Sequence, residues 1–359
     1  MRHALLTGFP GFIGRRLARR LLDEQPELRL TALVEARTED VARRTAATIG
    51  RERLEVVVGD IAERHLGLSD HDHNALSATV DVVFHLAAIY DLAVSATLAQ
   101  RVNVEGTGNV IEFCAGCERL ERHVYVSTAY VAGTRTGTVY EHELVLGQGF
   151  KNHYEATKFQ AEVWVHERMD AVPTTVLRPA IVVGDSRTGE TEKFDGPYYI
   201  LRMISQAERA GRRATQLGRS DAPFNVVPVD YVVDAMSAAA QDPRMVGETL
   251  HLVDIKPLSA RDLVDLLSIE YAGRPTRGRV PTALVSAVLS IPALRARFVD
   301  TPPESIAYLN HPVSFDTRRA VDLLGRHGLA PPRFESYVKA MVDFFRAHER
   351  DAALVPAKR

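Results

Sequence analysis

Thr7-Gly8-Phe9-Pro10-Gly11-Phe12-Ile13-Gly14 is the stretch that decides the fold of this chain. It follows a short apolar run, residues 3–6, and precedes a helical pattern in which Ile13, Leu17 and Leu21 recur one turn apart. Glycines let the backbone turn sharply and approach a pyrophosphate closely, and the start of a helix offers free N–H groups and a favourable dipole. A strand, a glycine turn and a helix in this order predict the phosphate-binding start of a dinucleotide fold.

The composition is that of a globular protein, with 46% hydrophobic and 25% charged residues. A chain of 359 residues is long enough for one large α/β domain, alone or with a small lobe. The formal net charge of −2 argues against a nucleic-acid-binding surface. A functional strand that starts at residue 3 argues against a signal peptide, and two cysteines fit a reducing compartment, so a cytoplasmic location is expected.

Apolar runs recur along the first half of the chain, at residues 28–34, 54–58, 80–86, 122–127 and 174–178. With helical patterns between them, these runs predict an α/β fold with a doubly wound parallel sheet and right-handed crossovers. The pattern loosens after Gly184, and strand-like runs return near residues 224–229 and 249–253. We therefore expect two parts: a dinucleotide-binding domain of residues 1–184 plus 225–255, and a smaller, mostly helical substrate-binding lobe of residues 185–224 plus 256–359.

One segment of that lobe, residues 283–291, is almost wholly apolar. It is too short to cross a bilayer, which takes about 20 apolar residues, and no transmembrane segment is expected. We expect a buried helix that also lines a lipophilic pocket, and an interfacial membrane helix is the alternative.

Two clusters of metal-binding residue types need an interpretation. Cys114 and Cys117 form a Cys-x-x-Cys, a spacing found in redox pairs and in half of a metal site. Both fall late in a predicted helix without a second cysteine pair, so we interpret them as apolar packing residues. His65, His71 and His73 lie among polar residues with no predicted helix or strand to fix their geometry. A solvated loop and no metal site are expected there.

The segment Asn152-His153-Tyr154-Glu155-Ala156-Thr157-Lys158 places a tyrosine and a lysine four residues apart, on one face of a predicted helix. Asn152, with Glu155 three residues later, is expected to form a capping box that starts this helix. An unperturbed tyrosine has a pKa near 10, roughly three units too high for acid–base work at neutral pH. A nearby ammonium favours the phenolate and lowers that pKa, so Tyr154 and Lys158 predict a proton-transfer pair.

The glycine spacing, Gly8-x-x-Gly11-x-x-Gly14, resembles that of the extended short-chain dehydrogenase/reductase family. In that family a Tyr-x-x-x-Lys follows the fifth strand, which is where Tyr154 and Lys158 stand. The stretch 126–133 resembles the family's active-site Ser/Thr segment, which lies at the carboxyl end of that strand. The resemblance implies a Rossmann fold, an NAD(P) cofactor, no metal, and a catalytic set of Thr128, Tyr154 and Lys158.

Further stretches resemble the parts of that family that touch the cofactor. Gly59-Asp60-Ile61 follows the third strand, where Asp60 would meet the adenine, and His85-Leu86-Ala87-Ala88 ends the fourth. Asn103 stands on a helix that carries an active-site Asn in the family, and Pro179 stands in a loop beside the nicotinamide. The cofactor-binding residues that the resemblance implies are Gly8, Phe9, Gly11, Phe12, Ile13, Gly14, Glu35, Arg37, Asp60, Ile61, Leu86, Ala87, Ala88, Asn103, Ser127, Tyr154, Lys158 and Pro179.

The choice between NAD and NADP depends on the residues that end the second strand. An acidic residue there hydrogen-bonds the free 2′-OH of NAD, whereas an arginine accommodates the 2′-phosphate of NADP. Glu35 would repel a phosphate, while Arg37 and Arg15 would attract one. Reductases that this chain resembles commonly have an arginine where Glu35 stands. Because reduction is the expected direction, NADP is slightly favoured and NAD stays open.

Within the family, the chain is most similar to the thioester reductase and fatty acyl-CoA reductase-like branch, on residues 7–14, 149–154, 224–232 and 314–320. The resemblance implies an oxidoreductase that transfers hydride to a carbonyl and reduces a lipophilic acyl thioester to an aldehyde or alcohol. Thr128 would orient the carbonyl, Tyr154 would exchange the proton, and Lys158 would tune Tyr154 and hold the ribose. The thioester would arrive on CoA or on a carrier protein, and a homodimer is a compatible assembly.

Three alternatives stay open. The first is a ketone/alcohol dehydrogenase that acts on a steroid-like or other hydrophobic small molecule. A sugar-nucleotide epimerase or dehydratase fits less well, because the lobe is apolar and no obvious phosphate-binding stretch follows residue 185. A non-catalytic NAD(P)-binding protein fits least, because both Tyr154 and Lys158 are present.

Overall fold

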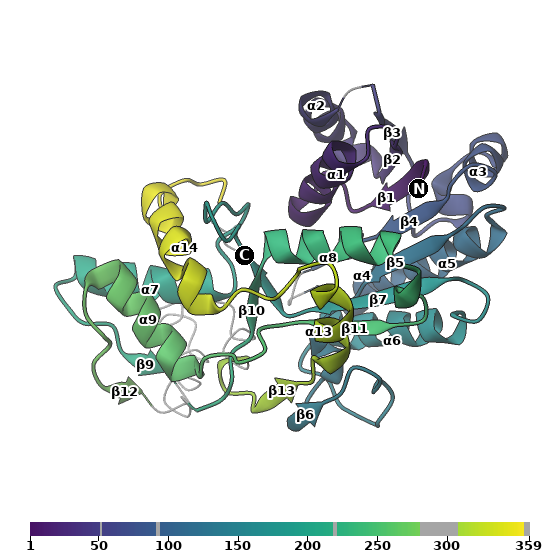
Figure 1. Ribbon diagram of the computed structural model, residues 1–359. Coiled ribbons are helices and arrows are strands. Elements are labelled where there is room, and N and C mark those ends of the chain that lie inside the picture. The colour runs from purple at the N-terminus through teal and green to yellow at the C-terminus, as the bar shows by residue number, and fades with distance from the viewer. Residues whose placement is uncertain (51, 91–93, 218–220, 281–307, 355–359) are drawn as a thin grey trace.

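A computed structural model of the chain describes residues 1–50, 52–90, 94–217, 221–280 and 308–354 (Figure 1). Its main feature is a seven-stranded sheet in which every neighbouring pair of strands runs parallel. In spatial order the strands are β3 (Leu54–Val58), β2 (Arg29–Val34), β1 (His3–Thr7), β4 (Val82–His85), β5 (Arg122–Val126), β7 (Thr174–Pro179) and β11 (Thr249–Leu252). The predicted doubly wound parallel sheet is therefore confirmed.

The strand order changes direction at β1. The chain builds outward from β1 to β2 and β3, then returns to the other side of β1 with β4 and continues to β5, β7 and β11. The helices that follow β1 and β4, residues 12–24 and 106–116, consequently pack on opposite faces of the sheet. Open α/β sheets bind their ligands at this kind of switch point.

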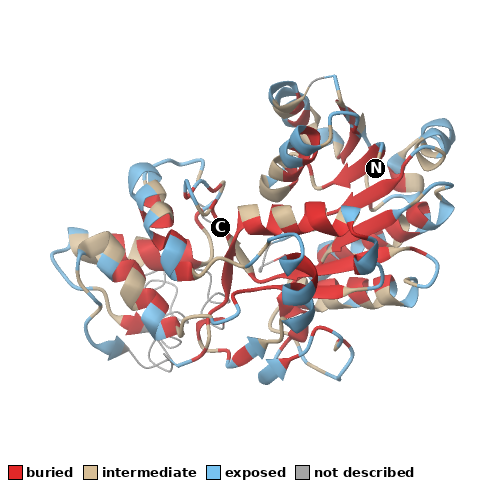
Figure 2. Cartoon of the chain, viewed as in Figure 1, coloured by how far each residue is buried: buried red, intermediate tan, exposed pale blue. Residues whose placement is uncertain are grey.

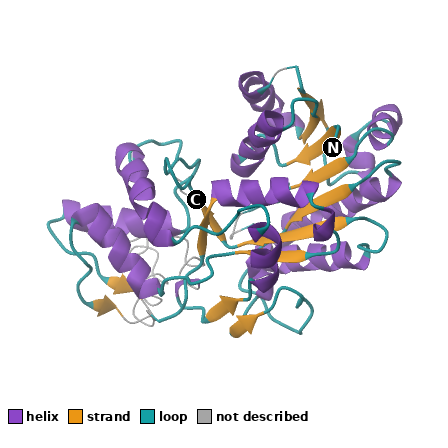
Figure 3. Ribbon diagram, in the orientation of Figure 1, coloured by secondary structure: helices purple, strands orange, loops and turns teal. Residues whose placement is uncertain are grey.

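Helices cover both faces of the sheet because alternate strand residues point to opposite sides. In β1, Ala4 and Leu6 belong to one core and Leu5 to the other. The strands are almost wholly buried between the two helical layers (Figures 2 and 3). The first face is covered by α1 (Phe12–Glu24), α2 (Glu39–Ile49) and α8 (Val229–Gln241), and the second by α3 (Asp70–Ser77), α5 (Gly106–Gly116) and α6 (His153–Glu167).

A third core, smaller than that of the sheet's first face, lies to one side of the sheet, where three helices pack together (Figure 1). These helices are α7 (Pro197–Arg209), α9 (Ala260–Ala272) and α14 (Phe334–His348). Three two-stranded sheets lie outside the central sheet in the described residues: β8 (Ile181–Val183) with β10 (Val226–Pro228), β9 (Gln216–Leu217) with β12 (Arg279–Val280), and β6 (Gly137–Val139) with β13 (Val313–Phe315). The apolar segment 283–291 lies outside the described residues.

One helix of the expected lobe packs against the sheet instead. α13 (Arg318–Gly325) lies beside β11, and its Ala320, Leu323 and Leu324 belong to the core of the sheet's first face. The division of the chain into two domains stays a prediction, and α13 shows that the stretch 256–359 contributes to the core of the sheet's first face as well as to the third core. Among the described residues, no helix combines the length and the apolar character that crossing a bilayer requires.

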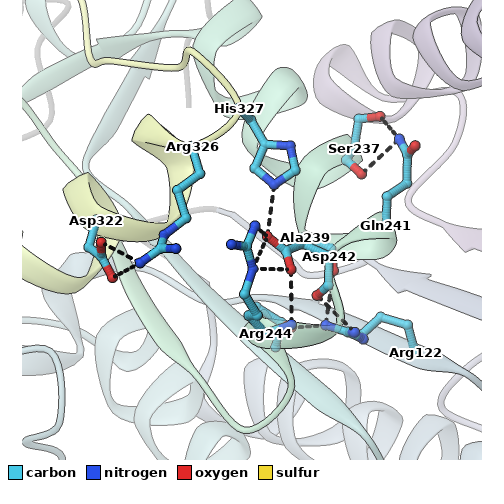
Figure 4. A network of polar contacts seen from close by, with 10 residues as sticks. Arg122, Ser237, Ala239, Gln241, Asp242, Arg244, Asp322, Arg326 and His327 are labelled. Carbon is cyan, nitrogen blue, oxygen red and sulfur yellow. Dashed lines mark hydrogen bonds and ion pairs between the residues drawn. The ribbon is translucent and has the colours of Figure 1, made fainter.

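A polar network around Asp242 fixes the end of α8 at the amino-terminal edge of the sheet (Figure 4). Arg122, the first residue of β5, donates hydrogen bonds to the carbonyl oxygens of Ala239 at 3.0 Å and Asp242 at 3.1 Å. The Asp242 carboxylate accepts from Arg244 at 2.6 Å and lies 2.9 Å from Nε2 of His327. The hydrogen bond from Arg244 and the contact with His327 hold the pKa of Asp242 well below its usual range. This network lies at the opposite edge from the glycine turn and is structural.

Candidate active site

The glycine turn leaves the carboxyl end of β1 and starts α1. Gly8 has a φ of +86°, and its carbonyl oxygen accepts a hydrogen bond from the Gly11 N–H at 3.0 Å. A Cβ on Gly8 would lie 2.9 Å from Cβ of Leu86, and a Cβ on Gly14 would lie 2.6 Å from the Gly8 carbonyl oxygen. α1 begins at Phe12 without a side-chain cap, so the first N–H groups of the helix are available to an outside acceptor. The turn therefore has the cradle that a pyrophosphate needs.

The end of β4 is tied to the glycine turn by Thr7. The Thr7 hydroxyl oxygen accepts hydrogen bonds from the backbone N–H groups of Leu86 at 3.2 Å and Ala87 at 3.1 Å. It also lies 2.8 Å from Nδ1 of His85, which is fully buried. The structure thus brings together two groups of cofactor-binding residues that the sequence predicted separately, those of the turn and those of residues 86–88.

The charged residues expected near the cofactor ribose are ion-paired within the protein. Arg37 makes a two-pronged ion pair with Glu35, with nitrogen–oxygen distances of 2.5 and 3.0 Å, and both side chains are exposed. Arg15, expected to attract a 2′-phosphate, instead pairs with Glu192 at 2.6 Å and with Glu190 at 3.3 Å. Its charge is therefore already balanced by a loop far along the chain.

Three further predicted cofactor residues are fixed by internal contacts. Asp60 accepts a hydrogen bond from the Ala62 N–H at 2.8 Å, and the Ile61 side chain is buried against Gly106. The buried Asn103 side chain accepts from the Ile89 N–H at 2.8 Å. Asn103 stands in a π-helical turn, Gln100–Glu105, between α4 (Ala96–Ala99) and α5. π-Helical turns are frequent at functional sites, and this one was not predicted from the sequence.

Thr128 and Tyr154 meet beyond the carboxyl end of β5. Thr128 caps a short 3₁₀ helix, Ala129–Ala132, and its hydroxyl lies within hydrogen-bonding reach of the Tyr154 phenol and 3.4 Å from the carbonyl oxygen of Pro179. Burial and the nearby charge of Glu155 raise the pKa of Tyr154 above its ordinary value, while the contact with Thr128 acts in the opposite direction. The carbonyl-orienting hydroxyl and the proton donor expected from the sequence are thus neighbours.

Lys158 is on the same helix as Tyr154, but its ammonium is directed elsewhere. Nζ donates hydrogen bonds to the hydroxyl of Tyr125 and to the carbonyl oxygen of Val126, both at 2.8 Å. Burial lowers the pKa of Lys158 to about 7, against the opposing effect of Glu162. The expected lowering of the Tyr154 pKa by Lys158 is therefore not seen in this structure, because the described hydrogen bonds of the ammonium go to β5.

Ser127, predicted near the cofactor, hydrogen-bonds the carboxylate of Glu162. Glu162 also pairs with Arg178, and both side chains are fully buried. Burial alone would raise the pKa of Glu162, but Arg178 and hydrogen bonds from His166 and Ser127 lower it to about 2. This pair was not predicted from the sequence, although Glu162 is four residues after Lys158 and is therefore expected on the same helical face.

The start of α6 is joined to the third core. Asn152 accepts the Glu155 N–H at 2.9 Å, as a capping box requires, but the Glu155 carboxylate accepts from the N–H of Lys151 at 3.0 Å and not from that of Asn152. The reciprocal half of the predicted box is therefore displaced by one residue. The hydroxyl of Tyr308 donates to Glu155 at 2.8 Å and accepts from Asn152 at 2.9 Å. The ring of Tyr90 packs edge-on against that of Tyr154, with centroids 5.2 Å apart.

The cysteine and histidine clusters do not form a site in the described structure. Cys114 and Cys117 are free thiols, and burial raises both pKa values, that of Cys117 to about 12. The prediction that the histidine segment is a loop is wrong in part, because His71 and His73 lie on α3. Within the described residues, no group of three or more His, Cys, Asp or Glu side chains is arranged to hold a metal ion.

Comparison with known proteins decides the family. A family model described as male sterility protein matches residues 6–236. The chain belongs to the male sterility protein family. The matched residues of this family member contain the glycine turn, Thr128, Tyr154 and Lys158. Its fold and its relatives are those of NAD(P)-dependent reductases of the extended short-chain dehydrogenase/reductase type.

Relatives of this family member include two curated proteins of different length. It is 29% identical over 285 residues to the isonitrile lipopeptide synthase of Mycobacterium tuberculosis, covering 70% of this chain but 11% of that one. It is 23% identical over 377 residues to fatty acyl-CoA reductase 1 of Arabidopsis thaliana, covering 82% of this chain and 75% of that one. The family member thus spans only a small part of the synthase.

A solved structure shares the whole fold of this family member. The terminal R domain of the myxalamid PKS-NRPS biosynthetic pathway superposes with a TM-score of 0.81 at 25% sequence identity, covering 98% of this chain and 91% of that one.

Proposed function

We propose that the protein reduces a lipophilic acyl thioester to an aldehyde or alcohol with NAD(P)H. The observation that carries the proposal is the meeting of Thr128 and Tyr154, with Lys158 on the same helix, beside the switch point of the sheet. The glycine turn supports the cofactor, because its backbone leaves no room for a Cβ at Gly8 or Gly14. A bound nicotinamide would supply the hydride.

The roles of the chain's own residues follow from this placement. Thr128 would donate a hydrogen bond to the substrate carbonyl oxygen, and Tyr154 would deliver a proton to that oxygen as hydride reaches the carbon. In the thioester the carbon–sulfur bond then breaks, and the thiol leaves with a proton as the carbonyl of the aldehyde re-forms. Tyr154 is protonated at neutral pH, and its raised pKa makes release of the proton harder, so the proton would pass only to a strongly basic acceptor such as the alkoxide oxygen that forms on the substrate. Lys158 would hydrogen-bond the ribose of the cofactor.

The thioester would be presented on CoA or on a carrier protein. Two observations support this class of substrate: a relative that is named a fatty acyl-CoA reductase, and a structural neighbour that is the terminal domain of a biosynthetic pathway. NADP is proposed as the preferred cofactor, since Arg37 neutralises Glu35 and is itself largely exposed beside the end of β2. The cytoplasmic location and the homodimer stay predictions.

The test is oxidation of NADH and NADPH against a panel of long-chain acyl-CoAs, aldehydes and hydrophobic ketones. Thioester-dependent oxidation that disappears in Tyr154→Phe is the expected result. Turnover of ketones or secondary alcohols without any thioester activity would instead favour the dehydrogenase alternative and reverse the ranking.

A further inference from the structure

The hydrogen bonds of Lys158 lead away from the substrate and into the sheet. Its Nζ lies 2.8 Å from the hydroxyl of Tyr125 and 4.3 Å from the centroid of the Tyr125 ring. Tyr125 is fully buried on β5, and its hydroxyl is hydrogen-bonded to that of Thr107 on α5. The Thr107 oxygen lies 3.0 Å from Nε2 of His85, which in turn contacts Thr7. A buried line of hydrogen-bonded side chains therefore runs from Lys158 to Thr7, the residue before Gly8.

The donor and acceptor of each hydrogen bond along this line can be assigned by starting at Thr7. The hydroxyl oxygen of Thr7 already accepts two backbone N–H groups, so its own proton must go to Nδ1 of His85. His85 then carries its proton on Nε2 and donates it to the hydroxyl oxygen of Thr107. The Thr107 hydroxyl donates to the carbonyl oxygen of Asn103 at 2.7 Å. Its remaining lone pair is left to accept the proton of Tyr125.

These assignments make the Tyr125 hydroxyl oxygen a hydrogen-bond acceptor for Lys158. With its proton committed to Thr107, Tyr125 presents lone pairs to the ammonium of Lys158. Burial raises the pKa of Tyr125 well above 10 and lowers that of His85 well below 6.5, so neither group changes charge at neutral pH. A protonated His85 would add a second cation to the same buried space and would break its contact with Thr7.

Two titratable groups lie one helical turn from Lys158 on its own helix. Tyr154 is one turn before it and stays neutral, and Glu162 is one turn after it and favours the ammonium. The Glu162 carboxylate also forms an ion pair with Arg178. Among the described residues that hydrogen-bond Nζ directly, only Tyr125 contributes a side chain, since the other acceptor is the backbone of Val126.

We propose that Tyr125 is a positioning residue for Lys158: its hydroxyl, oriented by Thr107 and neutral His85, accepts a hydrogen bond that keeps the buried lysine charged and fixed in place. The proposal rests on the proposed function in that it takes Lys158 to be part of the catalytic set. It assigns a role to a strand residue whose side chain is enclosed in the fold and has no access to solvent.

The test is a titration of Lys158 followed by NMR in protein labelled with 13C at the lysine ε carbon. The signal is assigned by its loss in Lys158→Met. The wild-type protein is expected to titrate near pH 7. Tyr125→Phe keeps the ring under Nζ but removes the acceptor, so the pKa of Lys158 should fall by about one unit, which is a tenfold change in its protonation equilibrium. With the best substrate, the alkaline limb of kcat should move to lower pH by the same amount.

The matched control is Tyr231→Phe, which removes the hydroxyl of a buried tyrosine on α8, on the other side of the sheet. It should leave both the titration and the pH profile unchanged. A folded Tyr125→Phe whose Lys158 titrates as in the wild type would overturn the proposal. Should Tyr125→Phe fail to fold, Thr107→Val decides: a smaller shift in the same direction supports the proposal, and an unchanged pKa overturns it. Because the titration needs no substrate, absence of thioester reduction would count against the proposed function alone.

Discussion

Replacing Gly14 by alanine should weaken the binding of NAD(P)H, because the added Cβ would collide with the backbone of the glycine turn. The Cβ would lie 2.6 Å from the carbonyl oxygen of Gly8 and 3.0 Å from its carbonyl carbon. That oxygen already accepts the Gly11 N–H at 3.0 Å, so the collision cannot be relieved by rotating a side chain. The turn itself must move by about 0.4 Å to restore a contact of 3.0 Å, the shortest that Cβ atoms normally make.

The size of the effect follows from the cost of overpacking. An extra carbon in a closely packed site costs about 1–3 kcal/mol. If that strain is imposed on the cofactor-binding form of the turn, the Kd for NAD(P)H rises roughly 5- to 150-fold, at about 1.4 kcal/mol for each factor of ten. The phosphate-binding N–H groups of α1 move with the turn, which adds to the loss.

The assay is a titration of nicotinamide fluorescence, with the Tm of each variant measured beside it. Gly116→Ala is the matched control, because Gly116 ends α5 and a Cβ there would meet nothing within 4 Å. The control should bind NAD(P)H as the wild type does. A Gly14→Ala protein with a Kd within twofold of the wild-type value would refute the assignment of this turn to the cofactor.

Three further substitutions test the rest of the site. Tyr154→Phe should reduce kcat by about 10²- to 10⁴-fold and leave the Kd for NAD(P)H unchanged, since only the proton donor is lost; normal turnover would remove Tyr154 from proton transfer. Glu35→Arg should raise the ratio of kcat/KM for NADPH over NADH, because the pair that now neutralises Arg37 is lost; a constant ratio would place Glu35 outside the ribose site. Glu162→Gln should lower the free energy of unfolding by about 3–5 kcal/mol at pH 7, because Arg178 is left buried without a counter-charge. The pKa of Glu162 is about 2 in the folded protein and about 4.3 when unfolded, so this difference should be full above pH 4.3 and shrink as the pH falls toward 2; urea unfolding at pH 7 and pH 3 that gives an equal difference would contradict the account.

The features predicted well from the sequence are those that local spacing encodes. Gly11 and Gly14 face the backbone of Gly8, within seven residues, and Tyr154 and Lys158 share a helix because they are four residues apart. Apolar runs predicted the strands of the sheet, since buried parallel strands are apolar on both faces.

The features that were missed depend on partners far apart in the chain. Lys158 was predicted on the helix of Tyr154, where it lies, but its hydrogen bond to a tyrosine 33 positions earlier was not predicted. Arg15 was expected at a phosphate, but its carboxylate partners lie about 175 residues away. Spacing along one helix cannot show which distant element faces a long side chain.

A local signal was also overlooked. Ser69 accepts the Asp72 N–H and starts α3, so the Ser-x-x-Asp pattern at residues 69–72 marked a helix where a loop was predicted. The polar composition of that segment describes an exposed helix as well as it describes a loop.

The central claim is that hydride passes from the nicotinamide to the carbonyl carbon of an acyl thioester. The most direct measurement is mass spectrometry of the product formed from a long-chain acyl-CoA and NADPH that carries deuterium in place of both C4 hydrogens. The account predicts one deuterium at C1 of the aldehyde, or two at C1 of the alcohol, together with stoichiometric free CoA. Release of free CoA with unlabelled fatty acid as the only product, or no reaction with any thioester under conditions in which NADPH binds, would contradict it.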